Sequence, residues 1–582
     1  MSAMLAALNP GWLLIFVGVV AMFLPARRIR QSLAIGAPLV GILMLALADQ
    51  NVNHLTASVL GLDLVLYRVD GLSFVFGLAF LIAALLNAIY AWHTDDRIQD
   101  GMALAYGGAA IAAAFCGDLM TLFVFWEITA VTSVFMVLGA GTRASYFASM
   151  RYLGMQILSG VLLLAGIAYV YHDTGDIGLQ VFEDLAQPGA MLIFIAFGIK
   201  AAFPFLHNWL QDSYSKASVV GAVVLSAFTT KLAVYAFARM FPGQDSLIWI
   251  GAIMTCFPVF FAVIENDLRK VLAYSTNNQI GFMICAIGVG TPLAMNGAVA
   301  HAFADIMFKG LLFMSMGAVL YRTGTTKASE LGGLFRSMPW TTLFCLVGAL
   351  SISAMPLFSA FVTKSMILSA VAHAGLPIIW LMLMFASAGV LEHSGIKIPY
   401  FAFFGHDSGK RVKEAPFNML LAMGMAAFIS IAIGIPALIP GLGYEWLYNL
   451  LPYRQEAMTY QPFTFDHVLT QMQLLVLATF AFVLLKRFNI YPPEKRGEIL
   501  DTDWAYRRVG FSMANWAGTV WGKVGPAMTS VFFKLSSRAY DRIEATFSPR
   551  GELARGGLTG AMAVWTAALL GLVLLLAFIS VR

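Results

Sequence analysis

Charged residues at the centres of long apolar segments are the feature that most constrains how this chain can fold. Glu127 lies in TLFVFWEITAVTSVFMV, and Lys200 lies in MLIFIAFGIKAAFPF. A charge at bilayer depth costs about 2.5–3.5 kcal/mol by insertion scales, so such residues are rare in membrane helices and usually mark ion pathways. Four more charged residues lie in apolar segments: Lys231, Asp305, Lys309 and Lys364. The pattern predicts a membrane protein with acid and base groups in series along a path for protons or ions.

The composition indicates a protein that crosses the membrane many times. Of the 582 residues, 60% are hydrophobic and 12% are charged, whereas soluble domains have about 25% charged residues. The net charge of +5 gives no reason to expect nucleic-acid binding. The four cysteines lie singly in apolar runs, and no Cys or His spacing suggests a metal site. The sequence has no nucleotide-binding or haem-binding motif, so we expect no cofactor and no metal.

Apolar segments set the number of helices. A membrane span needs about 20 apolar residues, and by this rule the chain contains about sixteen helices. They are centred on residues 10–26, 31–48, 70–92, 101–116, 119–140, 148–171, 188–208, 217–240, 246–264, 271–290, 295–320, 340–360, 376–404, 416–438, 465–486 and 558–580. The stretch 340–374 is compatible with one helix broken near Pro356. Residues 59–71 alternate apolar and polar side chains, as a short hairpin outside the membrane would.

Basic residues in alternate loops predict the orientation. Arg27 and Arg28 follow the first predicted helix, and Lys410 and Arg411 follow the thirteenth. Because short loops rich in Lys and Arg stay in the cytoplasm, we place the odd-numbered connections there and both termini on the other side. The first apolar run lacks the charged start and cleavage site of a signal peptide, so we expect a retained helix.

Residues 487–557 form the one long polar stretch, and a last apolar segment follows it. From about residue 515 to 547, Trp, Phe and Leu mix with Lys and Arg. This composition suits an amphipathic helix that lies along the membrane surface. A plain connecting loop is the alternative.

Pro204 predicts a helix break beside Lys200. Proline lacks the N–H that would bond the carbonyl four residues earlier, and that carbonyl belongs to Lys200. Broken helices occur at membrane depth where backbone lines a cavity or is packed in protein. Loss of water favours the neutral amine of a lysine, while a nearby carboxylate favours the ammonium. Lys200 is therefore a candidate proton carrier with Glu127 as its modulating partner; a static ion pair between them is the alternative.

Two further groups of polar residues lie in the second half of the chain. His301, Asp305 and Lys309 are four residues apart, so they share one helix face over roughly 12 Å and are compatible with a proton wire. His301 alone would also suit a packing role. Lys364 follows Pro356 and gives a second break with a lysine nearby. The thirteenth predicted helix holds three residues that either form an exit or extend to the membrane surface: Glu392, His393 and Lys397.

Several stretches resemble a known superfamily, the antiporter-like membrane subunits of Mrp-type Na⁺/H⁺ antiporters (the D subunit above all), respiratory complex I and membrane-bound hydrogenases. The resemblance covers about residues 65–370 and is carried by FVFWEITAVTSVF, GIKAAFPFLHNWLQD, LSAFTTKLAVYAFAR, ENDLRKVLAYSTNNQIGFM and HAFADIMFKGLLFMSMGAV. It implies an all-α integral membrane fold with two inverted five-helix repeats, each containing a broken helix, and a C-terminal lateral helix. The segment WLQDSYSKASVV departs from the family's proline-rich pattern.

The resemblance also implies roles for single residues. Glu127 resembles the key glutamate of the family, Lys200 the central lysine and Lys231 the relay lysine of the next helix. The resemblance places further proton-translocation residues in the second repeat: His301, Asp305, Lys309 and the terminal Lys364. The implied segments are N-terminal helices 1–100, first repeat 101–240, second repeat 241–404, additional helices 405–486, cytoplasmic loop and lateral helix 487–557, and last helix 558–582.

Three functions fit these observations. The leading one is a proton- or cation-translocating subunit of a multisubunit monovalent cation/proton antiporter in a bacterial inner membrane. The second is a proton-pumping subunit of a redox-driven complex, and the third is a membrane subunit that energises inorganic carbon uptake. In each case we expect other membrane subunits and lipid as partners and protons, with Na⁺ as a further candidate, as the transported ions. A series made mostly of lysines favours protons, since Na⁺ would need oxygen ligands.

Overall fold

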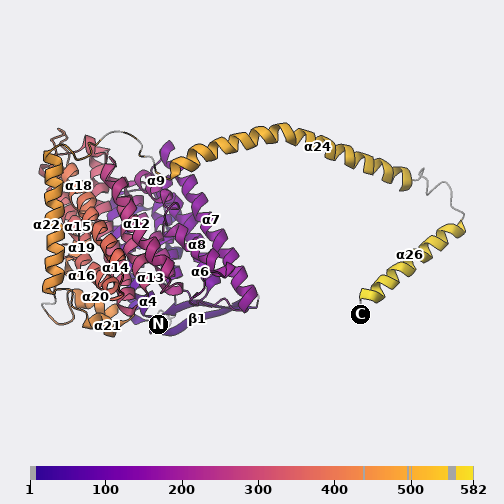
Figure 1. The fold of residues 1–582 in the computed structure, drawn as a ribbon, viewed down its shortest axis with the longest axis horizontal. Coiled ribbons are helices and arrows are strands. Elements are labelled where there is room, and N and C mark those ends of the chain that lie inside the picture. The colour runs from indigo at the N-terminus through magenta and orange to yellow at the C-terminus, as the bar shows by residue number, and fades with distance from the viewer. Residues whose placement is uncertain are drawn as a thin grey trace. The chain divides into compact units, whose positions relative to one another are not determined.

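The computed structural model describes residues 8–59, 61–436, 439–494, 497, 499, 501–547 and 559–580. The chain divides into two compact units, Met1–Asp501 and Thr502–Arg582, which are described separately below. Unit 1 is a bundle of helices that run side by side, and β1 lies at one end of the bundle, where α20 and α21 also lie (Figure 1).

From residue 8 onward, the N-terminal part of unit 1 contains four α-helices and one hairpin. Asn9 caps the first helix, and Asp70 and Ser73 form a capping box that begins the third. The hairpin is antiparallel and begins earlier than the alternation at 59–71 indicated. The elements are α2 Pro10–Phe23, α3 Arg27–Leu47, β1 Val52–Val59, β2 Leu62–Val69, α4 Gly71–Tyr90, the 3₁₀ turn η1 Ala91–His93 and α5 Arg97–Ala114.

The next part holds the first broken helix. A long helix pair is followed by two short helices and then by a helix that is interrupted at Phe228, where a single helix over 217–240 was expected. The elements are α6 Leu119–Leu138, α7 Arg143–Thr174, α8 Pro188–Lys200, α9 Asn208–Lys216, α10 Val219–Ala227 and α11 Thr229–Met240.

A second group of helices follows with the second break and then two π-helical segments. The elements are α12 Asp245–Ile264, α13 Leu268–Val289, α14 Pro292–Thr323, the 3₁₀ turns η2 Ala328–Glu330 and η3 Leu334–Arg336, α15 Pro339–Ile352, α16 Ser359–His373, α17 Pro377–Val390, η4 Leu391–Ile396, α18 Lys397–Pro399 and η5 Tyr400–Phe404. π-Helical turns are rare in proteins, and those that occur are frequently found at functional sites. The π-helical segment η4 contains Glu392 and His393.

In the described residues, unit 1 ends with four helices, and unit 2 contains one long helix, one apolar helix and two short helical segments. Unit 1 ends with α19 Phe417–Ala432, α20 Tyr444–Leu450, α21 Arg454–Thr459 and α22 Phe465–Arg487. Unit 2 contains α23 Asp503–Ala505, the π-turn η6 Tyr506–Gly510, α24 Phe511–Phe547 and α26 Thr559–Ser580. The long α24 includes the stretch 515–547 and contains Pro526.

Length and hydropathy identify the spans that are clearest. Among the described residues, nine helices are long and apolar enough to cross a membrane, and several shorter apolar helices accompany them. The shorter ones include the two halves before the breaks, α8 and α15. The fold is therefore that of a mostly helical, multi-pass integral membrane protein.

The two helix breaks have the same backbone conformation. In the first break, Ala202 and Phe205 have positive φ angles of 62° and 68°, and Pro204 lies between them. In the second, Ala354 and Leu357 have φ angles of 56° and 76°, and Pro356 lies between them. The proline ends the hydrogen-bond ladder in each case, so both predicted breaks are present, α15 and α16 being the two halves of the broken stretch 340–374.

Candidate functional site

Lys200 is the last residue of α8 and is completely buried beside the first break. Its Nζ donates hydrogen bonds to the carbonyl of Trp126, at 2.7 Å, and to the hydroxyl of Thr129, at 2.9 Å. The ammonium also lies 4.2 Å from the centre of the Trp126 ring, a distance at which a cation is attracted by the π-electrons. Lys200 is thus held by uncharged groups of α6.

Glu127 adjoins this site without touching the lysine. Its Oε1 is buried and has no hydrogen-bond partner among the described protein groups. The side chain packs against Gly160 of α7, where a Cβ atom would overlap Oε1. Lys200 and Glu127 interact electrostatically, but no ion pair forms between these two described residues. The alternative of a static ion pair is therefore wrong for this conformation.

Lys231 and Asp305 form a fully buried ion pair. Lys231 Nζ lies 2.6 Å from Asp305 Oδ2, and both side chains are fully buried. Nζ also donates to the carbonyl of Ser226, at 2.9 Å, which the interruption between α10 and α11 makes available. This pair joins α11 to α14. The spacing of Asp305 along α14 gave no sign of its partner.

His301 and Lys309 lie on α14 on either side of Asp305. His301 Nδ1 is 2.8 Å from the hydroxyl of Thr363, and its Nε2 is 3.1 Å from Oε1 of Gln279. Lys309 Nζ donates to the hydroxyl of Ser275, at 2.7 Å. All three charged or titratable residues of the face are buried, so the predicted stripe exists. His301 and Lys309 have partners on α13 and α16, whereas Asp305 pairs with Lys231 on α11.

Lys364 is bound at the second break. Its Nζ donates to the carbonyl of Ile352, the last residue of α15, at 3.1 Å. It also lies 4.8 Å from the centre of the Phe282 ring. His301 interacts electrostatically with Lys364, Lys309 and Lys231, which places the lysines of the second half and Lys231 in one electrostatic group.

The candidate exit residues divide into three environments. His393 Nδ1 is 2.8 Å from the hydroxyl of Ser394, which donates to Ser275, at 2.8 Å. Lys397 donates instead to carbonyls at the end of α12, 2.5 Å away at Val263 and 2.7 Å away at Glu265. Glu392 accepts from the hydroxyl of Tyr491, at 2.5 Å. Only His393 of the three is connected by these contacts to Lys309.

A polar stretch of α13 connects the first helix break with α14. The sequence alone gave this stretch no role. Asn277 Nδ2 donates to the carbonyl of Ala202 in the first break, at 2.7 Å. Ser275 meets Lys309, and Gln279 meets His301. The signal was the run of polar residues STNNQ inside an apolar helix, all of them fully buried. Buried polar side chains are retained where they are hydrogen-bonded.

A second unforeseen contact lies on the other side of the first break. Asp501 Oδ2 accepts from the hydroxyl of Tyr274, at 2.9 Å, and lies 3.1 Å from Nε2 of His207. His207 immediately precedes α9. The end of unit 1 is therefore fixed to the broken helix, across 294 positions of sequence. No group of His, Cys, Asp or Glu suited to a metal ion occurs in the described part of the chain.

Comparison with known proteins places this geometry in context. Residues 116–390 match the family described as NADH:quinone oxidoreductase/Mrp antiporter, TM. The D subunit of the Na⁺/H⁺ antiporter of Alkalihalophilus pseudofirmus is 30% identical over 354 residues, which are 56% of this chain and 71% of the relative.

Two solved structures share the fold. One chain of the Mrp complex from Dietzia sp. DQ12-45-1b superposes with a TM-score of 0.67 at 21% identity, over 81% of this chain and 99% of that chain. One chain of an archaeal respiratory complex, the membrane-bound sulfane sulfur reductase, superposes with a TM-score of 0.68 at 22% identity, over 97% of this chain and 99% of that one.

Proposed function

The chain belongs to the NADH:quinone oxidoreductase/Mrp antiporter family of membrane subunits, and from this premise we propose that it is the proton-translocating subunit of a multisubunit monovalent cation/proton antiporter. The lysine series supports the proposal most directly. The four lysines of the series are buried, namely Lys200, Lys231, Lys309 and Lys364, and all except Lys231 are held by uncharged acceptors. No carboxylate in the described part of the chain forms an ion pair with these three lysines, so no ion pair opposes the release of their protons.

Two parts of the route have direct contacts. Lys309 connects through Ser275 and Ser394 to His393, and Asp305 connects α14 to Lys231. Between Lys200 and Lys231 the described residues provide polar atoms rather than a direct contact. Thr230, the neighbour of Lys231, and Asn277, which binds to Ala202 in the first break, each have a buried oxygen without a partner among the described protein groups, and such atoms are common binding positions for bridging water.

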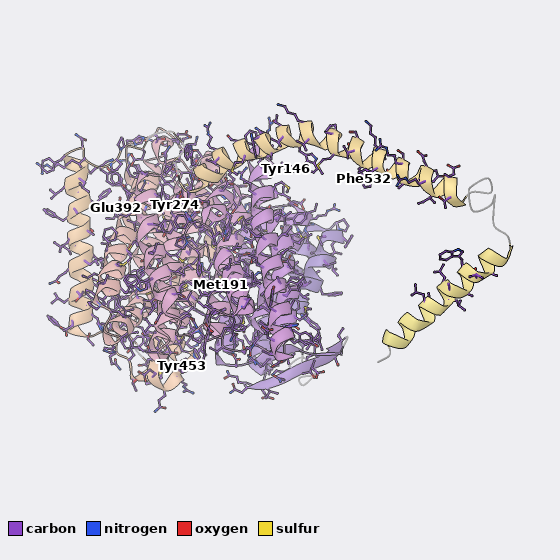
Figure 2. The ribbon with its side chains drawn as sticks, turned by 45° about the vertical axis from the view of Figure 1, so that its right-hand side comes forward. Tyr146, Met191, Tyr274, Glu392, Tyr453 and Phe532 are labelled. Carbon is purple, nitrogen blue, oxygen red and sulfur yellow. The ribbon has the colours of Figure 1, made fainter. Side chains whose placement is uncertain are left out.

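The proposal includes two inverted repeats and about sixteen spans in all. Asp118 caps α6 and pairs with Gly178, and Asp267 caps α13 and pairs with Lys327. In each case a 32-residue helix lies between the paired residues, namely α7 and α14. Asp118 accepts from the backbone of Val65 at the hairpin end, while Tyr274, close after Asp267, lies near the opposite end (Figure 2). These matching features in opposite directions support an inverted relation.

Loop charges support the proposed orientation. The basic loop around Lys410 follows η5, and Glu392, ahead of η5, lies near the end of unit 1 opposite Tyr453 (Figure 2). We therefore assign that end to the cytoplasm of a bacterial inner membrane and the hairpin end to the other side. In unit 2, α24 carries Trp, Phe, Lys and Arg on an exposed helix, which suits a lateral helix that binds partner subunits or the membrane surface.

The intact assembly, purified through a tag on this chain and reconstituted in proteoliposomes, tests the proposal. An imposed Na⁺ or K⁺ gradient should drive proton movement that a pH-sensitive dye reports. Lys309→Ala should abolish it, because the amine that binds to Ser275 is lost, while the exposed loop variant Lys413→Ala should not. Normal exchange by Lys309→Ala would contradict the proposal.

A redox-driven proton pump is the second candidate, and one observation favours it. The likeness to the sulfane sulfur reductase chain extends over 97% of this chain, compared with 81% for the Mrp chain. Proton movement that requires an electron donor and acceptor, and that no cation gradient drives, would support this candidate over an antiporter.

A further inference from the structure

A cavity of about 150 Å³ lies between α16, α17 and α22, and Lys364 is one of the residues that line it. Apolar side chains line much of it, and its polar lining comes from two helices: Lys364, Ser365 and Ser369 on α16, and Asp466, His467, Thr470 and Gln471 on α22. A water molecule in the liquid occupies about 30 Å³, so the cavity has room for several. Apart from Lys364, the residues that line this cavity do not belong to the lysine series.

The cavity changes from buried to exposed along its length. Lys364, Ser365 and Gln471 are buried, Ser369 and His467 are half-buried, and Asp466 at its mouth is exposed. The inner end is fixed at the second break, because Gln471 Nε2 donates to the carbonyl of Ser353, at 3.1 Å. The arrangement therefore connects a membrane-buried ammonium with the surface.

Hydrogen bonds assign a proton-accepting nitrogen to the cavity. His467 Nδ1 is 3.2 Å from the carbonyl of Pro462, which can only accept, so Nδ1 carries the hydrogen. Nε2 then accepts from the hydroxyl of Ser369, at 3.2 Å. Ser369 in turn lies 3.0 Å from the hydroxyl of Tyr460, which donates to it in this arrangement. The charged or titratable groups around the ring are Lys364 of α16, Asp466 of α22 and Tyr460.

The cavity opens at the hairpin end of unit 1. Ser369 contacts Tyr460, just after α21, and α20 and α21 lie at the end where β1 lies (Figure 1). His393 leads from Lys309 towards the opposite end, where its neighbour Glu392 lies (Figure 2). The second half of the protein thus has polar connections in two directions.

We propose that this cavity is the proton exit on the hairpin side and that His467 is its terminal proton-exchanging group. The inference rests on the proposed function. The ammonium of Lys364 gives a proton to water in the cavity and becomes a neutral amine. Ser369 accepts that proton while passing its own to Nε2 of His467. The imidazolium then releases a proton to bulk water and returns to the neutral form.

Thiol labelling tests the cavity independently of transport. In the intact assembly with Cys256→Ser, Ser369→Cys should react with a charged, membrane-impermeant methanethiosulfonate applied from the hairpin side and not from the other side. Ala370→Cys is the matched control, since Ala370 is buried and does not line the cavity. Reaction of Ser369→Cys from both sides equally, or no reaction, would overturn the assignment.

Chemical rescue tests the role of His467. His467→Ala should slow proton translocation by roughly 100-fold, the lower end of the range for a positioned proton-transfer group. Imidazole added on the hairpin side should restore it, and imidazole on the other side should not. His373→Ala, an exposed histidine at the end of the same α16, should transport normally. Unchanged transport by His467→Ala, or rescue from either side, would overturn the inference.

The two proposals fail in different ways. If the unmodified assembly moves no protons, the proposed function fails, and the labelling result still decides whether water reaches Ser369. If it moves protons and the labelling or the rescue fails, the exit lies elsewhere and the function stands.

Discussion

The two helix breaks share a backbone and differ in charge. Ala202 and Ala354 have the same left-handed conformation two residues before a proline. At the first break the lysine is the last residue of the leading helix, Lys200, whereas its equivalent at the second break is Ile352. There the amine comes from Lys364, on the following helix, and binds to the carbonyl of Ile352. Each break therefore has one buried ammonium. At the first break it comes from the helix before the break, and at the second it comes from the helix after the break.

The comparison shows that the backbone conformation of a break does not depend on the position of the nearby lysine. Proline ends the hydrogen-bond ladder, and the residue two positions before it and the residue directly after it have positive φ angles, whatever the neighbouring charge. The surroundings then differ. Lys200 faces α6 and lies near an unpaired carboxylate, while Lys364 faces the cavity that leads to His467.

The largest effect is expected from replacing either lysine by arginine. Lys200→Arg and Lys364→Arg keep a positive charge that cannot be released in a protein. Both variants should abolish proton exchange driven by a pH gradient in vesicles, as Lys200→Ala should, while co-purification of partner subunits persists.

Lys413→Arg in the exposed loop controls for the substitution itself. Normal exchange by Lys200→Arg together with loss in Lys364→Arg would limit proton carriage to the second break. The reverse result would limit it to the first.

Much of this comparison was accessible from the sequence. Proline four residues after a buried lysine predicts a break from covalent geometry alone. The four-residue spacing of His301, Asp305 and Lys309 places them on one helix face. Both expectations follow from local rules and agree with the structure, as do the broken stretch 340–374 and the presence of a hairpin.

The contacts between distant segments were not accessible. Lys231 and Asp305 are far apart in the sequence, and only the packing of α11 against α14 brings them together. Glu127 was assigned to Lys200 because it is a carboxylate at the centre of its segment. The two groups do interact electrostatically, but the Glu127 side chain packs against Gly160, and this contact was not accessible from the sequence. Asp501 lay in a polar stretch that indicated a loop, and its contact with His207 depends on the path of the chain after α22.

Removing the carboxylate near Lys231 and removing the one near Lys200 should have different effects on the stability of the protein. Asp305→Asn removes the partner of Lys231 and leaves a buried charge, which costs about 3–5 kcal/mol. Glu127→Gln breaks no hydrogen bond, so the thermal stability of the detergent-solubilised assembly should change little. Its transport should fall, and its pH optimum should move to lower pH, because the Lys200 ammonium loses an attractive charge.

Gly160→Ala tests the same point without changing a charge. A methyl group there would occupy the position of Glu127 Oε1 and displace the carboxylate. The pH profile should shift as in Glu127→Gln. Profiles that match the unmodified protein in both variants would show that Glu127 does not influence Lys200.

Truncation of the tail should affect the first break more than the second. His207 has Ser359 as its equivalent, and only His207 is joined to the end of unit 1, through Asp501. Ending the chain after Asp501 removes α24 and α26 but keeps this contact, so partner binding should fall while the pH profile of the remaining activity stays unchanged. Ending it after Lys486 removes the contact as well.

Asp501→Asn in the full chain separates the two effects. It should leave partner binding intact, as measured by co-purification, and alter transport moderately. A shifted pH profile after truncation at Asp501 would instead place the tail in the ion path.

The smallest effect concerns the shared backbone. A left-handed conformation costs a non-glycine residue about 1–2 kcal/mol. Replacement by glycine removes this cost, but part of the gain in stability is lost because glycine gives the unfolded chain more conformational freedom. Ala202→Gly and Ala354→Gly should therefore each stabilise the protein by about 1 kcal/mol or less. Ala201→Gly is the matched control, because Ala201 has a right-handed conformation, with φ of −75°, and should destabilise. Thermal unfolding measures all three. Stabilisation at one break and destabilisation at the other would show that the two breaks differ in backbone as well as in charge.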